Sequence, residues 1–114
     1  MKSEKVYLFH IRDAIATILT YTKGLSENDF YENGLIKDAV IRNFEIIGEA
    51  SKRISKQTRL EYPQVPWAQM AGMRDKLIHD YIQVDLQRVW DVVDKILPDL
   101  KRDIDFIISK HIER

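Results

Sequence analysis

The stretch LIKDAVIRNFEIIGEASKRIS at residues 35–55 has the hydrophobic pattern of an amphipathic α-helix. Its apolar side chains recur at intervals of three and four residues, which is the period of a helix face. These positions are Ile36, Ala39, Val40, Phe44, Ile47, Ala50 and Ile54. The apolar face is broad, while most charged side chains fall on the other faces. We therefore expect this helix to contact neighbours on two sides.

The segments before and after this stretch show the same helical period. Residues 4–22 form one predicted helix, which Gly24 ends, and residues 67–81 and 86–112 form two more. Ser26 with Asp29 three residues later resembles a capping box for a short helical turn, and Asn33-Gly34 has the composition of a turn. Pro98 interrupts the last segment, where we expect a kink or break because proline removes a backbone donor.

Prolines also separate the central stretch from the helix that follows it. Tyr62-Pro63 and Val65-Pro66 disfavour helical geometry, so residues 57–66 are predicted to be the longest loop. No segment alternates with period two for long enough to be a strand. The predicted fold class is all-α: an antiparallel four- to five-helix bundle in a single domain over residues 1–114, with its last long helix kinked or broken at Pro98.

Composition excludes several classes of function. The 18 basic and 18 acidic side chains cancel, so no global positive field attracts nucleic acid, and any RNA contact must be local. The chain has no cysteine, which excludes disulfides and thiolate chemistry and is typical of a reducing compartment. The charged N-terminus lacks the apolar core of a signal peptide, and no stretch approaches the roughly 20 apolar residues that span a bilayer. We expect a cytoplasmic protein without membrane contact.

One short segment, MRDKLIHDY at residues 73–81, concentrates residues capable of chemistry. Asp75 and His79 are four apart and share a helix face, so the carboxylate can orient the imidazole and favour its protonated form. Arg74 and His79 lie roughly 140° apart on an ideal helix. They can meet at one phosphate only if the helix ends near Ile78 or if a second subunit contributes, which favours a composite site.

Arginine and histidine together meet the needs of metal-independent RNA cleavage. A histidine can activate the ribose 2′-hydroxyl or protonate the leaving oxygen, and an arginine can bind the phosphate. The structural alternative is that Arg74 and His79 only complement the helix C-terminus, that Asp75 is a solvated helix residue, and that Tyr81 belongs to the edge of the core. His10 and His111 have no partner at metal-ligand spacing, so no metal site or cofactor is expected.

Arg74, His79 and Tyr81 follow the pattern arginine, four residues, histidine, one residue, tyrosine. This resembles the signature of HepT-like proteins in the HEPN superfamily, and residues 42–50 and 66–85 also look like that family. The resemblance implies a helical HEPN bundle that forms a homodimer, with both motifs at a shared cleft that cleaves RNA without a metal. It implies that Arg74 holds the phosphate, that His79 is the general acid or base, and that Asp75 orients His79.

The resemblance also implies a partner and a mode of control. In similar systems an MntA-like nucleotidyltransferase antitoxin transfers AMP groups to the motif tyrosine, here Tyr81, and the added negative charge would repel RNA. Arg53 and Lys76 are candidate RNA contacts. A local basic patch of Arg42, Lys52, Arg53, Lys56 and Arg59 is one interpretation, and a solvated helix face is the other.

Three functional hypotheses follow. The first is an endoribonuclease toxin of a type VII toxin–antitoxin system, neutralised by AMPylation of Tyr81. The second is a non-catalytic helical binding subunit of a minimal nucleotidyltransferase, which would not need His79. The third is a structural dimerisation bundle, which leaves the clustered Arg74, Asp75, His79 and Tyr81 unexplained.

Overall fold

The computed structural model describes residues 2–79 and 85–112, and among them it contains helices and turns but no β-strand. Four helices have 13 residues or more: α1 (Lys2–Thr22), α3 (Gly34–Lys52), α5 (Trp67–His79) and α7 (Leu97–Ile112). Three have six residues: α2 (Glu27–Glu32), α4 (Lys56–Glu61) and α6 (Leu86–Asp91). The predicted all-α class is confirmed.

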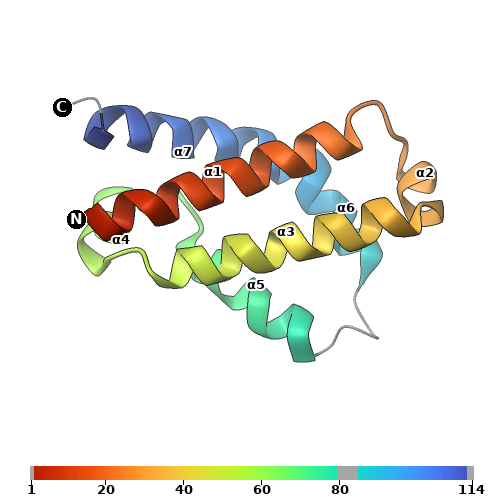
Figure 1. Ribbon diagram of the computed structural model, residues 1–114, viewed down its shortest axis with the longest axis horizontal. Helices are drawn as coiled ribbons and strands as arrows, with labels where there is room; N and C mark the ends of the chain where they lie inside the picture. The colour runs from red at the N-terminus through yellow and green to blue at the C-terminus, as the bar shows by residue number, and fades with distance from the viewer. Residues whose placement is uncertain (1, 80–84, 113–114) are drawn as a thin grey trace.

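The long helices lie side by side in the order α7, α1, α3, α5 (Figure 1). Helix α1 packs against both α3 and α7, and α3 packs against both α1 and α5. Neighbouring helices in this row run in opposite directions, as expected for an antiparallel bundle. The prediction that the central helix has contacts on two sides is therefore confirmed.

The core is formed by aliphatic side chains at three- and four-residue spacing on α1, α3 and α7. Burying each such side chain contributes about 1.5–3 kcal/mol relative to leaving it in water. Phe30 of α2 reaches the same core and its ring lies 5.3 Å from that of Trp90 of α6. Fully or almost fully buried members are Ile11, Ile15, Ile18, Val40, Phe44, Ile47, Leu100, Ile104 and Ile107.

Side-chain caps determine where α2 and α3 begin. The Ser26 hydroxyl accepts a hydrogen bond from the backbone N–H of Asp29, and the Asp29 carboxylate accepts one from the backbone N–H of Ser26. This is the predicted capping box, which satisfies donors that a helix start leaves open. Asn33 then caps α3 by accepting from the backbone N–H of Ile36.

The predicted loop at residues 57–66 is wrong in its first half, which forms α4. Ser55 is the N-cap of this helix and accepts from the backbone N–H of Thr58. The Glu4 carboxylate, 6% exposed, accepts from the backbone N–H of Ser55 (2.6 Å) and from the Thr58 hydroxyl (3.0 Å). The first proline comes only after Glu61, so nothing in residues 56–61 prevents a helix.

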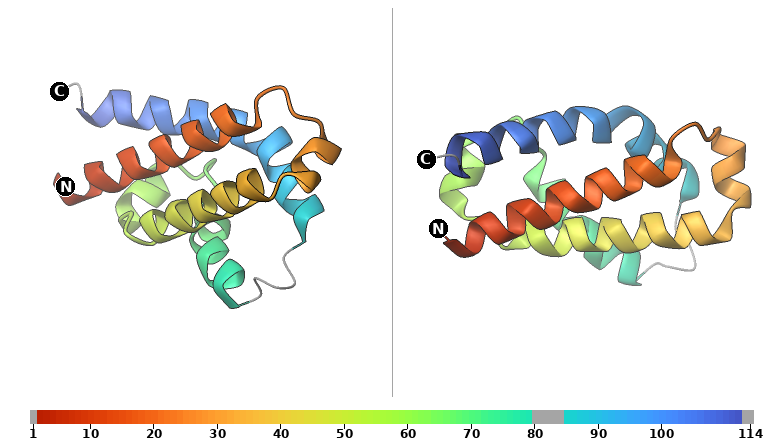
Figure 2. Two further views of the ribbon diagram at one scale, coloured as in Figure 1. Left: turned by 45° about the vertical axis from the view of Figure 1, so that its right-hand side comes forward. Right: turned by 45° about the horizontal axis from the view of Figure 1, so that its top comes forward.

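The interruption expected near Pro98 takes the form of a π-helical segment, η2 (Val92–Ile96), between α6 and α7. The backbone N–H of Leu97 donates to the carbonyl of Val92, five residues earlier, in place of the α-helical partner. Pro98 follows directly and has no N–H to donate. The chain changes direction here, so α6 and α7 are not collinear (Figure 2).

None of the helices described is both long and apolar enough to cross a membrane.

Candidate active site

Helix α5 carries the predicted site, and its start is fixed by a buried tryptophan. The indole N–H of Trp67 donates to the carbonyl of Tyr62 (3.0 Å), and the side chain is 5% exposed. The Tyr62 hydroxyl in turn lies 3.0 Å from Nε2 of His111 in α7. These contacts anchor the proline segment at both ends, so α5 begins from a defined position.

Helix α5 packs its apolar side against α3. Met70 is buried and Met73 is half-buried against the core. Positions 74 to 79 are helical throughout, so Arg74 and His79 occupy backbone positions about 140° apart around the axis of α5. The two positions of one chain therefore do not share a helix face.

Asp75 forms a tertiary ion pair that links α5 to α3. The Nζ atom of Lys52 lies 2.9 Å from Oδ1 and 3.0 Å from Oδ2 of the Asp75 carboxylate. The side chains are 35% and 55% exposed, so the pair is at the surface. Lys52 therefore connects the C-terminal end of α3 to the helical turn that precedes His79. The sequence indicates Lys52 only as one member of a possible basic patch, because a pair 23 residues apart leaves no periodic signal.

Several predicted site residues lie outside what the structure describes. The backbone of Arg74, Lys76 and His79 is described but their side chains are not, and Tyr81 is outside the described residues. The structure brings Lys52 and Asp75 together, and it places Arg74 and His79 on the same helix. The roles assigned from the sequence to these residues, including the orientation of His79 by Asp75, stay predictions.

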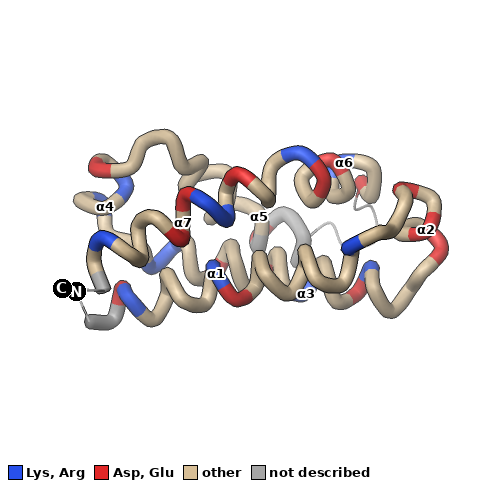
Figure 3. Tube along the Cα trace, turned by 90° about the horizontal axis from the view of Figure 1, so that it is seen from above, with Lys and Arg blue, Asp and Glu red and all other residues tan. Residues whose placement is uncertain are grey.

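The basic residues of the possible patch have different surroundings. The Arg59 guanidinium donates to the carbonyls of Ser51 (2.6 Å) and Ile54 (3.2 Å), so it completes the end of α3. Arg53 lies 3.6 Å from the Glu49 carboxylate and above the Tyr7 ring, yet its side chain is 57% exposed. Figure 3 shows basic and acidic residues interspersed along the bundle, while the residues at the α2 corner are mainly acidic.

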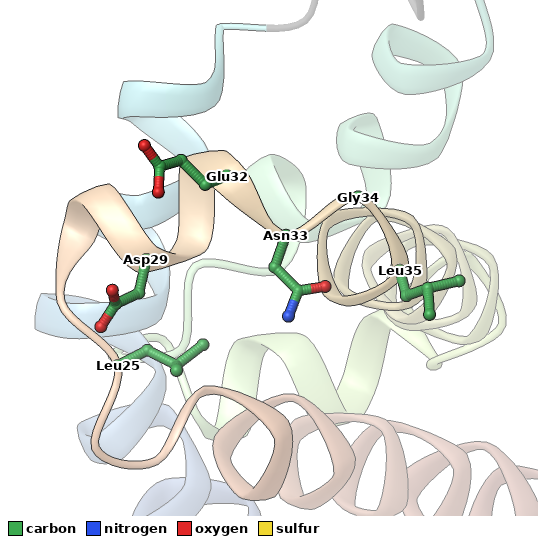
Figure 4. Close-up of a pocket in the computed structure, with 6 residues that line it drawn as sticks. All are labelled: Leu25, Asp29, Glu32, Asn33, Gly34 and Leu35. Atoms are coloured by element: carbon green, nitrogen blue, oxygen red, sulfur yellow. The ribbon is translucent and has the colours of Figure 1, made fainter.

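Two of the surface hollows in the described part of the chain have charged side chains in their lining. One lies at the corner of α2 and α3 and is lined by Leu25, Asp29, Glu32, Asn33, Gly34 and Leu35 (Figure 4). Its charged lining is acidic, which disfavours a phosphate group. The other is a groove between α1 and α3 that includes His10 and Arg42. No group of three or more potential metal-ligating side chains occurs among the residues described.

Comparison with known proteins matches nearly the whole chain. A family profile described as ribonuclease HepT-like matches residues 11–107. A probable ribonuclease HepT from Thermococcus cleftensis is 44% identical over 100 residues, which cover 88% of this chain and 91% of that protein. A putative RNase from Caldanaerobacter subterraneus subsp. tengcongensis is 38% identical over 110 residues, covering 96% and 98% respectively.

A third relative is a longer protein. The gamma-glutamylcyclotransferase and putative RNase of Methanocaldococcus jannaschii is 47% identical over 103 residues, which cover 90% of this chain but 46% of that protein. This chain thus spans about half the length of that relative. No solved structure matches the chain.

Proposed function

The chain belongs to the ribonuclease HepT-like family, and from this premise we propose that it is a metal-independent endoribonuclease toxin. Membership confirms the family predicted from the sequence and assigns the chain to the ribonucleases. One observation supports the proposed endoribonuclease activity. Arg74, Asp75 and His79 lie on the same helix, α5, and an ion pair between Asp75 and Lys52 links this helix to α3.

The proposed chemistry uses groups of this chain. His79 takes the proton of the ribose 2′-hydroxyl or donates one to the leaving 5′-oxygen, because an imidazole can do either near neutral pH. Arg74 binds the phosphate and stabilises the charge of the pentacoordinate transition state. Asp75 supports the cationic form of His79 from one helical turn away.

The proposed catalytic unit is a homodimer. On α5 the positions of Arg74 and His79 diverge by about 140°, so a single copy presents them on different faces. A two-fold related copy can place its Arg74 near the His79 of the first, which forms a composite cleft from two identical helices. The mixed surface charge fits an RNA contact confined to this cleft, with Arg53 and Lys76 as additional phosphate contacts.

The proposed control is covalent modification. In a type VII toxin–antitoxin system in the cytoplasm, an MntA-like nucleotidyltransferase transfers AMP to the hydroxyl of Tyr81. The oxygen of the tyrosine forms a bond to the α-phosphorus of ATP, and pyrophosphate leaves. The added phosphate places negative charge two residues from His79, which repels RNA and competes for Arg74.

Intact mass and RNA cleavage together test this proposal. Wild type, His79→Ala and Tyr81→Phe are purified with and without co-expression of an MntA-like nucleotidyltransferase. We expect wild type to cleave RNA, to gain mass in AMP units on co-expression and then to lose activity, while Tyr81→Phe stays active and unmodified. Unmodified wild type that binds the nucleotidyltransferase but leaves RNA intact would instead favour the binding-subunit function.

A further inference from the structure

The outward face of α3 carries a stripe of charged side chains with an unusual order. Asp38, Arg42, Glu45, Glu49 and Arg53 follow one another at intervals of four, three, four and four residues. At 100° per residue these positions fall within an arc of about 80° on the helix. Figure 1 shows α3 at the front of the bundle, with α1 on one flank and α5 on the other. No described element covers this stripe.

The side chains of the stripe are accessible to a partner. Asp38 and Arg42 are exposed, and the side chains of Glu49 and Arg53 are 45% and 57% exposed. The distance of 3.6 Å between Arg53 and Glu49 is longer than the 2.9 Å between Lys52 and Asp75.

The order of charges is complementary to its own reverse. Around the midpoint between Glu45 and Ile46, Asp38 is the mirror position of Arg53, and Arg42 is the mirror position of Glu49. An antiparallel copy of α3 centred there would place Asp38 opposite Arg53 and Arg42 opposite Glu49 in both chains, while Glu45 would lie beside the axis next to its own copy. Such two-fold self-complementarity is the requirement of an isologous interface.

We propose that two copies of this chain associate through the outward faces of α3, antiparallel, with the two-fold axis passing near Glu45 and Ile46. This inference rests on the homodimer of the proposed function and names the surface that forms it. The pairs are Asp38 with Arg53 of the other copy, and Arg42 with Glu49 of the other copy. Each pair occurs twice because of the symmetry.

The charge order also selects this register over its neighbours. A displacement of one helical turn in one direction would set Arg42 against Arg53 of the other copy. A displacement of one turn in the other direction would set Asp38 against Glu49, and it would also set Arg42 against Glu45. Both alternatives contain fewer pairs of opposite charge than the proposed register and add pairs of like charge, so the charge order favours the proposed register.

The surroundings of the stripe are suited to the same interface. The groove on its α1 side is lined in part by Tyr7, Ile46 and Ala50, which offer apolar surface beside the charges. On its other side, Lys52 holds Asp75 of α5. Helix α5 runs opposite to α3, so its C-terminal end is directed back along α3 toward the middle (Figure 1). The proposed axis thus brings the two α5 helices to the flanks of one interface.

Cysteine cross-linking provides the direct test, because the chain has no cysteine of its own. A residue beside the two-fold axis meets its own copy, and a disulfide forms when two Cα atoms approach within about 7 Å. Glu45→Cys is expected to give a covalent dimer on mild oxidation. Ser109→Cys on the exposed side of α7 is the matched control and should stay uncross-linked.

A charge swap tests the pairing itself. Arg42→Glu should weaken the dimer at least tenfold in analytical ultracentrifugation, and adding Glu49→Arg should restore it, since the double variant regenerates the pair with its signs exchanged. A dimer that forms without the Glu45→Cys cross-link and ignores Arg42→Glu would overturn this inference and leave the homodimer of the proposed function intact. A wild-type monomer that cleaves RNA would overturn both.

Discussion

Replacing Lys52 with methionine removes the ammonium group that holds Asp75 while it keeps a side chain of similar length. The Nζ atom contacts both carboxylate oxygens, at 2.9 and 3.0 Å, but the two side chains are 35% and 55% exposed. Pairs with this exposure contribute about 0.2–1 kcal/mol to stability. We therefore expect the free energy of unfolding to fall by at most about 1 kcal/mol, measured by urea denaturation.

The effect on catalysis is expected to be larger than the effect on folding. Removing Lys52 takes one positive charge away from Asp75, which in the proposed function stabilises the cationic form of His79 on the next helical turn. The limb of the pH–rate profile that the proposed function assigns to His79 should therefore move to higher pH, and Lys52→Arg should restore it.

Lys101→Met is the matched control for this experiment. Lys101 and Asp105 form a pair on α7 at 2.8 Å, and their side chains are 39% and 43% exposed. Its loss should lower stability by a similar amount and leave the pH–rate profile where it is. If Lys52→Met and Lys101→Met gave the same profile as wild type, the Lys52–Asp75 pair would have no part in positioning the site.

Four other substitutions test the fold. Gly72 lies within α5, and a Cβ built there meets no described atom within 4 Å. Gly72→Ala should therefore stabilise the protein by up to about 1 kcal/mol and raise Tm, and a lower Tm would contradict this. Glu4→Ala removes the acceptor of two hydrogen bonds at the start of α4 and should cost about 2–4 kcal/mol in urea denaturation, whereas a loss below about 0.5 kcal/mol would refute that role. The hydrogen bond from Tyr31 to Glu27 (2.5 Å) raises the pKa of Tyr31 from 10 to about 12. This hydrogen bond stabilises the folded protein fully below pH 10, and its contribution is lost as the pH rises through 12. A tyrosinate absorbance titration of wild type should show the ionisation of Tyr31 as a step near pH 12. Tyr31→Phe should remove this step, and Glu27→Gln should move it to lower pH.

Most of the fold was predictable from the sequence because the long helices have apolar faces of clear period. The central helix was expected at residues 35–55 and is observed as Gly34–Lys52, and the helix expected to begin at residue 67 begins there. The π-helical segment before Pro98 was predictable as an interruption, but its form depends on backbone bonding that no pattern reveals. Helix α4 was missed because its start depends on Glu4, which is 51 residues away from Ser55 in the sequence.

The candidate site was predictable only in its residue types and spacing. Arg74, Asp75 and His79 could be named because chemically capable side chains cluster in a few residues. The ion pair between Lys52 and Asp75 could not, because it depends on how α3 and α5 pack. The self-complementary stripe on α3 also required the structure, since the sequence alone does not tell which charged face stays uncovered.

The most direct test of the central claim is RNA cleavage by the purified, unmodified protein in the presence of excess chelator, beside His79→Ala of the same helical content by circular dichroism. The proposed function predicts that wild type cleaves RNA under these conditions and that His79→Ala loses the activity while it stays folded. Cleavage that survives in His79→Ala, or that wild type performs only when metal is restored, would contradict it.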